Sequence, residues 1–281
     1  MTYLLIQNMR VQSANMHHAS FLIGGPPVMP AYLFGHAMGR ELGFNVTGAV
    51  LVHHQMTPLG QLFYGTFSPQ QRRAAALTFT NKAGKDYSSK NQQALSLQPV
   101  ACAHLRMSIL LEVDDAPSSE AVKCFLSGRS APGRDPALGV GSGGGRFSGG
   151  QIVGQGLVDS FESIDDGLRH VSTGYFVMDR KDLLEPRDGK NQADLLIEHL
   201  GRMPDKESGD SWLSAACVGY AATTPFEQRD GARQGFDHAY AEPLVGMVQY
   251  RSVHAAPEDI FKVIWSPQWV SSDVFRVHQS A

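Results

Sequence analysis

The chain has 281 residues, of which 42% are hydrophobic and 18% are charged, so it is long and apolar enough to bury a sizeable core. No apolar run approaches the roughly 18 residues of a membrane span, and the N-terminus lacks a basic start followed by a cleavable apolar region. We therefore expect neither membrane attachment nor export. The three cysteines, Cys102, Cys124 and Cys217, are odd in number and lack metal-type spacing, which indicates a reducing, cytoplasmic setting.

Charge is distributed unevenly along the chain. The net charge is −3, but residues 1–111 carry eight Lys and Arg residues against two acidic residues, a net charge of +6, and the remainder carries −9. Such an asymmetry predicts a polyanionic partner for the basic part. Chance clustering of basic residues on a solvated face is the alternative interpretation, and composition does not decide between the two.

The N-terminal segment predicts a strand, a turn and a helix. Residues 3–15 separate into a mainly apolar and a mixed face with the period of two that is typical of a strand. After a Gly/Pro turn, residues 30–42 place apolar side chains at three-and-four spacing, and Gly43 supplies the stop. Gly35 and Gly39 lie four residues apart on that helix, where they allow another backbone to approach closely.

These motifs have a recognisable order. A first strand ending in Ala14-Asn15, a Gly/Pro loop and a helix that contains Gly35-His36-Ala37-Met38 and ends in glycine together resemble the Cas-five-like Csy subunit of type I-F CRISPR surveillance complexes. The resemblance implies an α+β fold over residues 1–281. This fold is an RRM-like (ferredoxin-like) palm of antiparallel sheet and helices with an inserted thumb. It also implies RNA-binding roles for Asn15, His36 and Arg40.

A second strand is predicted over residues 46–53, which are β-branched and apolar. His53 and His54 follow one another, so their side chains point to opposite faces of a strand and make a poor metal pair. A zinc site that joins them to His17 and His18 in space is the less favoured alternative, and we expect no metal.

Residues 60–98 are predicted to form an insertion that lies outside the core. Five basic residues and one acidic residue are interleaved with aromatic residues, a mixture that suits phosphate contacts and base stacking. The resemblance implies a thumb-like insertion here, with these basic residues near guide RNA: Arg72, Arg73, Lys82, Lys85 and Lys90. A basic loop whose aromatic rings are tucked into the core is the alternative.

The middle of the chain predicts a central strand followed by a helix. Residues 102–113 alternate and then become continuously apolar, as expected for a strand buried on both faces. Residues 115–119 offer helix caps, residues 121–126 supply an apolar face, and Gly128 ends the helix.

Residues 139–156 contain nine glycines in eighteen positions. No Gly-Lys-Ser/Thr follows, so the segment is not a P-loop, and it lacks the context of a dinucleotide fingerprint. A glycine-rich backbone is able to approach a phosphate chain and donate its amides. Residues 145–152 resemble the family's Gly-Arg-x-x-Gly-Gly-x-Ile loop, which implies that this loop faces the guide through Arg146, Phe147, Gly149 and Gly150. A flexible linker fits residues 139–144 better.

The remaining elements also resemble the family in their order. Expected here are a strand that begins at Tyr175 and runs into a helix start, a short helix over 194–200, and a strand over 212–220. Residues 241–250 resemble part of the family's C-terminal signature. Residues 260–267 resemble its C-terminal signature. Gln268-Trp269 stands where the family has His-Arg, which places the chain on a divergent branch.

Catalytic motifs are missing from the sequence: there is no nucleophile elbow and no His-Glu-x-x-His. We therefore predict a non-catalytic protein without a cofactor. The resemblance implies that it holds and caps the 5′ handle of the crRNA and docks on backbone Cas-seven-like subunits. A large subunit and target DNA are further candidate partners. One alternative is a backbone subunit that coats the spacer. Another is a guide-processing endoribonuclease that uses His18, His36 or His54.

Overall fold

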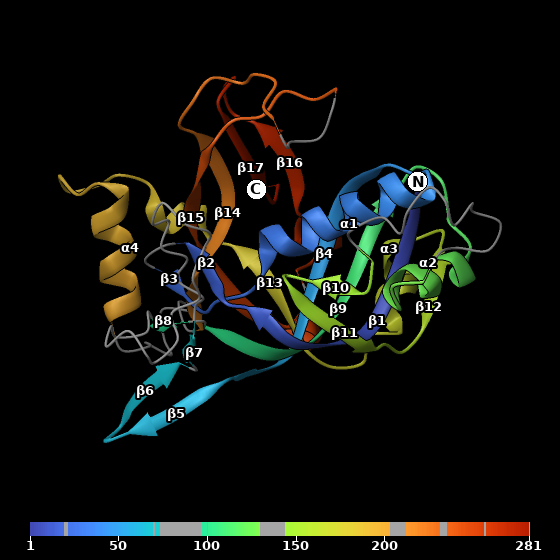
Figure 1. The fold of residues 1–281 in the computed structure, drawn as a ribbon, viewed down its shortest axis with the longest axis horizontal. Coiled ribbons are helices and arrows are strands. Elements are labelled where there is room, and N and C mark those ends of the chain that lie inside the picture. The colour runs from blue at the N-terminus through green and yellow to red at the C-terminus, as the bar shows by residue number, and fades with distance from the viewer. Residues whose placement is uncertain are drawn as a thin grey trace, which may run out of the picture.

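The computed structural model describes residues 1–19, 22–69, 101–129, 144–202, 212–230, 235–255 and 257–280, together with the backbone of 71–73 and 97–99. The described chain has an α+β fold built on one large antiparallel sheet (Figure 1). In spatial order its strands are β10 (Arg146–Phe147), β11 (Gly150–Gly154), β1 (Thr2–Asn15), β9 (Cys102–Val113), β4 (Val46–Pro58), β13 (Tyr175–Asp179), β15 (Ala241–Ser252), β14 (Leu213–Ala222), β17 (Val274–His278) and β16 (Ser266–Trp269), with β12 (Val158–Phe161) also paired to β1.

The strands expected at 3–15, 46–53 and 102–113 are confirmed and lie next to one another. Strand β9 pairs with β1 on one side and with β4 on the other, both antiparallel. Helix α1 (Val28–Leu42) connects β1 to β4, α2 (Ser119–Leu126) follows β9, and β11 then returns to the free edge of β1. Four strands thus stand in the order β11-β1-β9-β4.

Two hydrophobic cores lie on the two faces of the sheet. On the first face, α1 and α2 pack against side chains such as Leu4, Ile6 and Ile109. On the second face, α3 (Ile164–Arg169) and the 3₁₀ helix η5 (Ile260–Val263) pack against Tyr3, Leu5 and neighbouring apolar residues. The first core holds most of the buried residues because two longer helices cover that face.

Helix ends follow the local signals in the sequence. Gly43 adopts φ +86° and donates its N–H to the Gly39 carbonyl oxygen (2.8 Å), which ends α1 as expected. A Cβ on Gly39 would collide with the Phe44 carbonyl oxygen, so this glycine does permit a close approach of backbone. Gly35 instead makes room for the side chain of Leu111 from the sheet. Ser118 caps α2 by accepting from the backbone N–H of residue 121 (3.2 Å).

The C-terminal half extends the same sheet beyond β4. Strand β13 pairs with β4, and β15, β14, β17 and β16 follow in that order. Helix α4 (Gln192–Gly201) begins with a capping box formed by Asn191 and Asp194 and packs on the 3₁₀ helix η3 (Lys181–Leu184) through Leu183, Leu184 and Leu195. A further 3₁₀ turn, η4 (Val253–Ala255), follows β15. Strands β12, β15, β16 and β17 and helix α3 were not expected from the sequence.

Within the described part of the chain, three two-stranded sheets lie outside the large sheet. They pair β2 (His17–Ala19) with β3 (Leu22–Ile23), β5 (Gly60–Phe63) with β6 (Thr66–Pro69), and β7 (Gln71–Arg73) with β8 (Leu97–Pro99). The β5–β6 hairpin projects from the rest of the molecule, at the lower left of Figure 1. In the parts of the chain that the structure describes, no helix is long and apolar enough to cross a membrane.

Candidate nucleic-acid interface

The second face of the sheet is covered at one end only. There, α3 and η5 bury Tyr3, Leu5 and Leu110. Gln7 marks the boundary, because its side chain donates to the His170 carbonyl oxygen and accepts from the backbone N–H of residue 157. Beyond this boundary the side chains of the second face are exposed on three adjacent strands: Arg10 and Gln12 of β1, His104 and Arg106 of β9, and Gln55 and Thr57 of β4.

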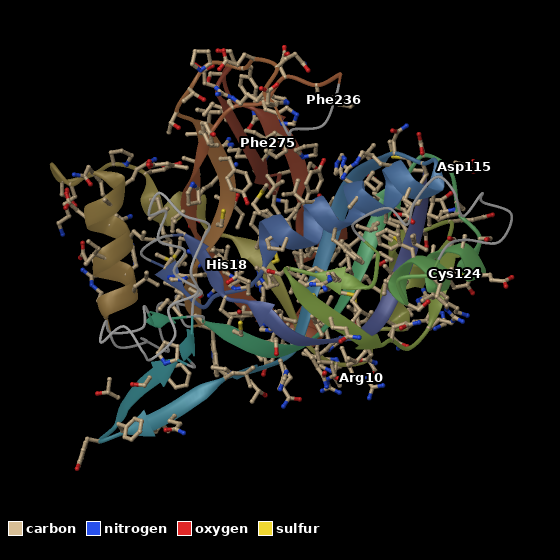
Figure 2. All side chains as sticks on the ribbon, viewed as in Figure 1. Arg10, His18, Asp115, Cys124, Phe236 and Phe275 are labelled. Carbon is tan, nitrogen blue, oxygen red and sulfur yellow. The ribbon has the colours of Figure 1, made fainter. Side chains whose placement is uncertain are left out.

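Two arginines stand directly opposite each other on this open half. Arg10 pairs in register with Arg106, and Arg106 pairs on its other side with Gln55. Strands β1, β4, β10 and β11 contain no acidic residue, and the single acidic residue of β9 is Glu112 at the covered end. Figure 2 shows Arg10 on the underside of the sheet, away from α1.

Within the described part of the chain, the arginine pair has no internal counter-charge. Among the described residues no carboxylate forms a salt bridge with Arg10 or Arg106. Like charges directly opposite each other on neighbouring strands are destabilising. An anion placed over both guanidinium groups removes this repulsion and forms charge-assisted hydrogen bonds. The open half of the second face therefore has the chemistry of an anion-binding surface.

Arg146 extends this surface at its edge. The register pairs Arg146 with Gln151 of β11, and Gln151 with Gln12 of β1. Directly paired residues of antiparallel strands project from the same face. Arg146 is exposed and therefore belongs to the same surface as Arg10 and Arg106. We call these three side chains the arginine surface.

The glycine-rich loop, of which residues 144–156 are described, forms a tight hairpin. Ser148 (φ +46°) and Gly149 (φ +75°) occupy its two central positions, and positive φ at both is the requirement of a type I′ turn. The Ser148 carbonyl accepts from the backbone N–H of Asn15 (2.7 Å), and the Ser148 hydroxyl donates to the Asn15 carbonyl (3.1 Å). The turn is thereby fixed to the end of β1.

Two residues expected to contact RNA have clear structural roles. The Phe147 ring is 1% exposed and packs in the first core against Phe34, at 5.5 Å between ring centroids, so it is not available to stack on a base. A Cβ on Gly150 would lie 2.5 Å from the Gln12 carbonyl oxygen and 2.7 Å from Ala14 Cα. Gly150 is thus required by the close packing of β11 on β1.

Of the other expected residues from the N-terminal region, His36 and Arg40 lie apart from the arginine surface. His36 and Arg40 are on α1, and α1 packs on the first face of the sheet, so the sheet separates them from Arg10. Burial and the charge of Arg40 lower the pKa of His36, whose ring lies 4.6 Å from that of Tyr32. The side chain of Asn15 closes a local turn through two hydrogen bonds with the backbone of residue 17.

The expected thumb is described only in part. Lys82, Lys85 and Lys90 lie outside the described residues, as do the side chains of Arg72 and Arg73 in β7. The aromatic residues of the β5–β6 hairpin, by contrast, are described and exposed rather than tucked into the core: Phe63, Tyr64 and Phe67.

His53 and His54 point to opposite faces of the sheet. His53 is 7% exposed and stacks on Tyr250 (5.3 Å between ring centroids), and burial, with a smaller effect of His54, lowers its pKa to about 4. His54 lies on the second face, where its Nε2 and the Ser108 hydroxyl form a 2.7 Å hydrogen bond. Burial and the nearby Arg106 lower the pKa of His54, and burial also lowers that of His18. The described residues contain no cluster of three or more metal-ligating side chains.

Arg10 and Arg106 were missed when the sequence was read by motif. Both lie inside predicted strands, at positions where the alternation places polar side chains. The alternation of apolar and polar residues therefore predicted that both side chains are exposed on the polar face of their strands. Their pairing across 96 positions was not visible in the sequence, because register is set by long-range contacts. No protein-family model matches the chain, and no curated protein is significantly similar to it. The function is therefore inferred from the sheet, its surface and the sequence resemblance.

Proposed function

We propose that this protein is a non-catalytic RNA-binding subunit of a type I-F CRISPR effector complex, where it holds and caps the 5′ handle of the crRNA. The observation that carries the RNA-binding part is the arginine surface. Arg10 and Arg106 oppose each other on an open sheet face, Arg146 flanks them, and no acidic side chain of the described strands neutralises them. A polyanionic strand is a ligand that satisfies such a surface.

The topology of the first half supports an RRM-like palm. Two strand–helix–strand units are present, β1-α1-β4 and β9-α2-β11, and they interlock so that the spatial order is β11-β1-β9-β4. Both helices pack on one face, which leaves the other face of the central strands available. RRM domains bind single-stranded RNA across this open face.

The surface departs from a standard RRM in one respect. RRM domains stack bases on aromatic side chains of the two central strands. The exposed central positions here are arginine, glutamine and histidine: Arg10, Gln12, His104 and Arg106. We therefore expect contacts with the ribose-phosphate backbone at the sheet, and base stacking at the exposed aromatic residues of the β5–β6 hairpin.

The position of the hairpin supports the thumb assignment. It follows β4 and projects from the body of the molecule (Figure 1). Phe63, at the end of β5, and Tyr64, in the turn, are exposed. A projecting aromatic element beside a basic sheet face is suited to separating stacked bases while phosphates are held at the sheet. Docking on backbone Cas-seven-like subunits, and any contact with a large subunit or target DNA, follow from the family resemblance alone.

Co-purification tests the proposal directly. Tagged full-length protein, expressed with its own CRISPR array and neighbouring genes, is expected to bring down one crRNA and several copies of a backbone subunit per copy of itself. A ratio of several copies of this protein per crRNA would instead assign it the backbone role. Preparations that carry no RNA in either the isolated or the assembled state would refute RNA binding altogether.

One observation favours a second candidate, a guide-processing endoribonuclease. His54 lies beside Arg106 on the same face as the arginine surface, and its lowered pKa leaves a neutral imidazole able to act as a base near neutral pH. Incubation of the purified protein with repeat RNA separates the two functions. Unchanged RNA agrees with the non-catalytic role, whereas shortening that is abolished by His54→Ala would establish the endoribonuclease.

A further inference from the structure

A second surface with ligand-binding character lies far from the arginine surface, at the top of Figure 1, where the loop between β14 and β15 meets the β16–β17 turn. An open pocket of about 600 Å³ is present there. Its lining combines two aromatic rings, a carboxylate and two hydroxyl groups, from Phe226, Trp269, Asp237, Ser271 and Ser272.

The walls of this pocket are held by an ordered scaffold. Residues 227 and 238 exchange two backbone hydrogen bonds across the loop (3.1 and 2.8 Å), and Gln228 Nε2 donates to Asp237 Oδ1 (2.8 Å). Trp269 rests edge-on against Phe275 at 5.3 Å and against Phe226 at 6.2 Å between ring centroids. Trp269 is nevertheless 60% exposed and Phe226 43% exposed, so these rings present apolar surface to a partner.

The charge around the pocket selects the class of partner. The described residues 223–230, 235–240 and 266–276 carry four acidic and two basic residues, a net charge of −2. Asp237 forms no ion pair with any Lys or Arg of the described residues, and Gln228 occupies only one of its oxygens. A net negative rim disfavours a phosphate-bearing ligand and favours a cation. Aromatic rings beside a carboxylate are the setting in which a guanidinium gains both cation–π and charge-assisted hydrogen bonds.

The same loop already holds one arginine in this manner. The guanidinium of Arg229 lies 4.9 Å from the centre of the Tyr240 ring, and its Nη2 is 2.8 Å from Glu227 Oε1. We propose that the pocket between Phe226 and Trp269 binds an arginine side chain of a partner protein, with Asp237 as the counter-ion. Hydroxyl groups of Ser271 and Ser272 supply further acceptors for the five N–H donors of the guanidinium. This inference does not depend on the RNA-binding proposal.

Peptide titration of the full-length protein tests the pocket. The probes are acetyl-Gly-Arg-Gly-amide, the same peptide with citrulline, which is nearly isosteric with arginine but uncharged, and GMP. The readout is the indole N–H resonance of Trp269 in a ¹H–¹⁵N spectrum, assigned with Trp269→Phe. We expect a saturable shift with the arginine peptide and affinity weaker by about tenfold or more with citrulline, because the cation–π and ionic contacts are lost.

Matched variants separate the pocket from general effects on charge or folding. Asp237→Asn is expected to weaken binding of the arginine peptide about tenfold, whereas Asp230→Asn, which removes a charge from the same loop outside the pocket lining, leaves it unchanged. Trp212→Ala removes a similarly exposed tryptophan elsewhere and is also expected to have no effect. Equal binding of the citrulline peptide, or no shift with the arginine peptide, would overturn the inference. A stronger response to GMP would identify a nucleobase site and refute the arginine assignment.

Discussion

Replacement of both opposed arginines is the sharpest test of the sheet surface. In the variant Arg10→Gln/Arg106→Gln, the side chains remain long and polar while two of the three charges of the arginine surface are removed. Each phosphate contact to a single strand contributes about 0.7 to the slope of log affinity against log salt concentration. The slope should therefore be shallower by about 1.4 in the double variant. If the three arginines are the only contacts, a fourfold rise in salt lowers wild-type affinity about 20-fold and that of the variant about threefold.

The assay is a fluorescence-anisotropy titration of the full-length protein with a labelled repeat-derived RNA at 50, 100 and 200 mM salt. Arg187→Gln/Arg202→Gln serves as the matched control, because it removes two exposed charges near α4 and leaves the sheet intact. The opposed arginines repel each other in the free protein, so the test variant should be as stable as wild type or more stable by up to about 1 kcal/mol. Identical salt slopes in wild type and the test variant would refute the assignment of RNA to this face.

Three further predictions concern the residues around the interface. Gly150→Ala should lower the free energy of unfolding by about 1–3 kcal/mol, because the new Cβ meets the backbone of β1. Chemical denaturation should show a smaller loss of this free energy for Gly149→Ala, whose Cβ meets open space. Phe147→Ala should lower the free energy of unfolding by about 3–5 kcal/mol, while the fraction that remains folded binds RNA normally; selective loss of RNA affinity would contradict its core role. His53 is neutral in the folded state down to about pH 4, whereas the unfolded chain takes up a proton near pH 6.5. The contribution of His53 to the free energy of unfolding should therefore be complete above pH 6.5 and fall by about 3 kcal/mol as the pH drops to 4. Chemical denaturation of His53→Phe should show a flatter dependence of this free energy on pH. An unchanged pH dependence in the variant would exclude His53 as the source of the effect.

Local elements were predictable because short-range signals specify them. Alternation of apolar side chains identified β1 and β9, and three-and-four spacing identified α1. Gly43 ends α1 in the left-handed conformation, and Ser118 caps α2 through its own side chain. Interactions of this kind join residues only a few positions apart, so the sequence contains them explicitly.

Residue type alone misassigned Phe147 in the candidate interface. An exposed arginine and a buried phenylalanine are adjacent in the glycine-rich loop, and the sequence motif gave both the same role. The pairing of β10 with β11 turns Arg146 toward the second face and Phe147 into the first core, because successive side chains of a strand point in opposite directions. The motif thus located the segment, and the strand geometry assigned the two side chains.

By itself, the sequence determined the periodicity of the strands, the ends of two helices and the excess of positive charge in the first 111 residues. Only the tertiary structure decided which charges act together. The strand register places Arg10 beside Arg106. The pairing of Gln12 with Gln151, and of Gln151 with Arg146, brings Arg146 to the same face of the sheet. Arg40 belongs to α1, which packs on the opposite face. The physical reason is that burial of one face of each strand fixes its register, and that register then dictates every neighbour on the face left exposed.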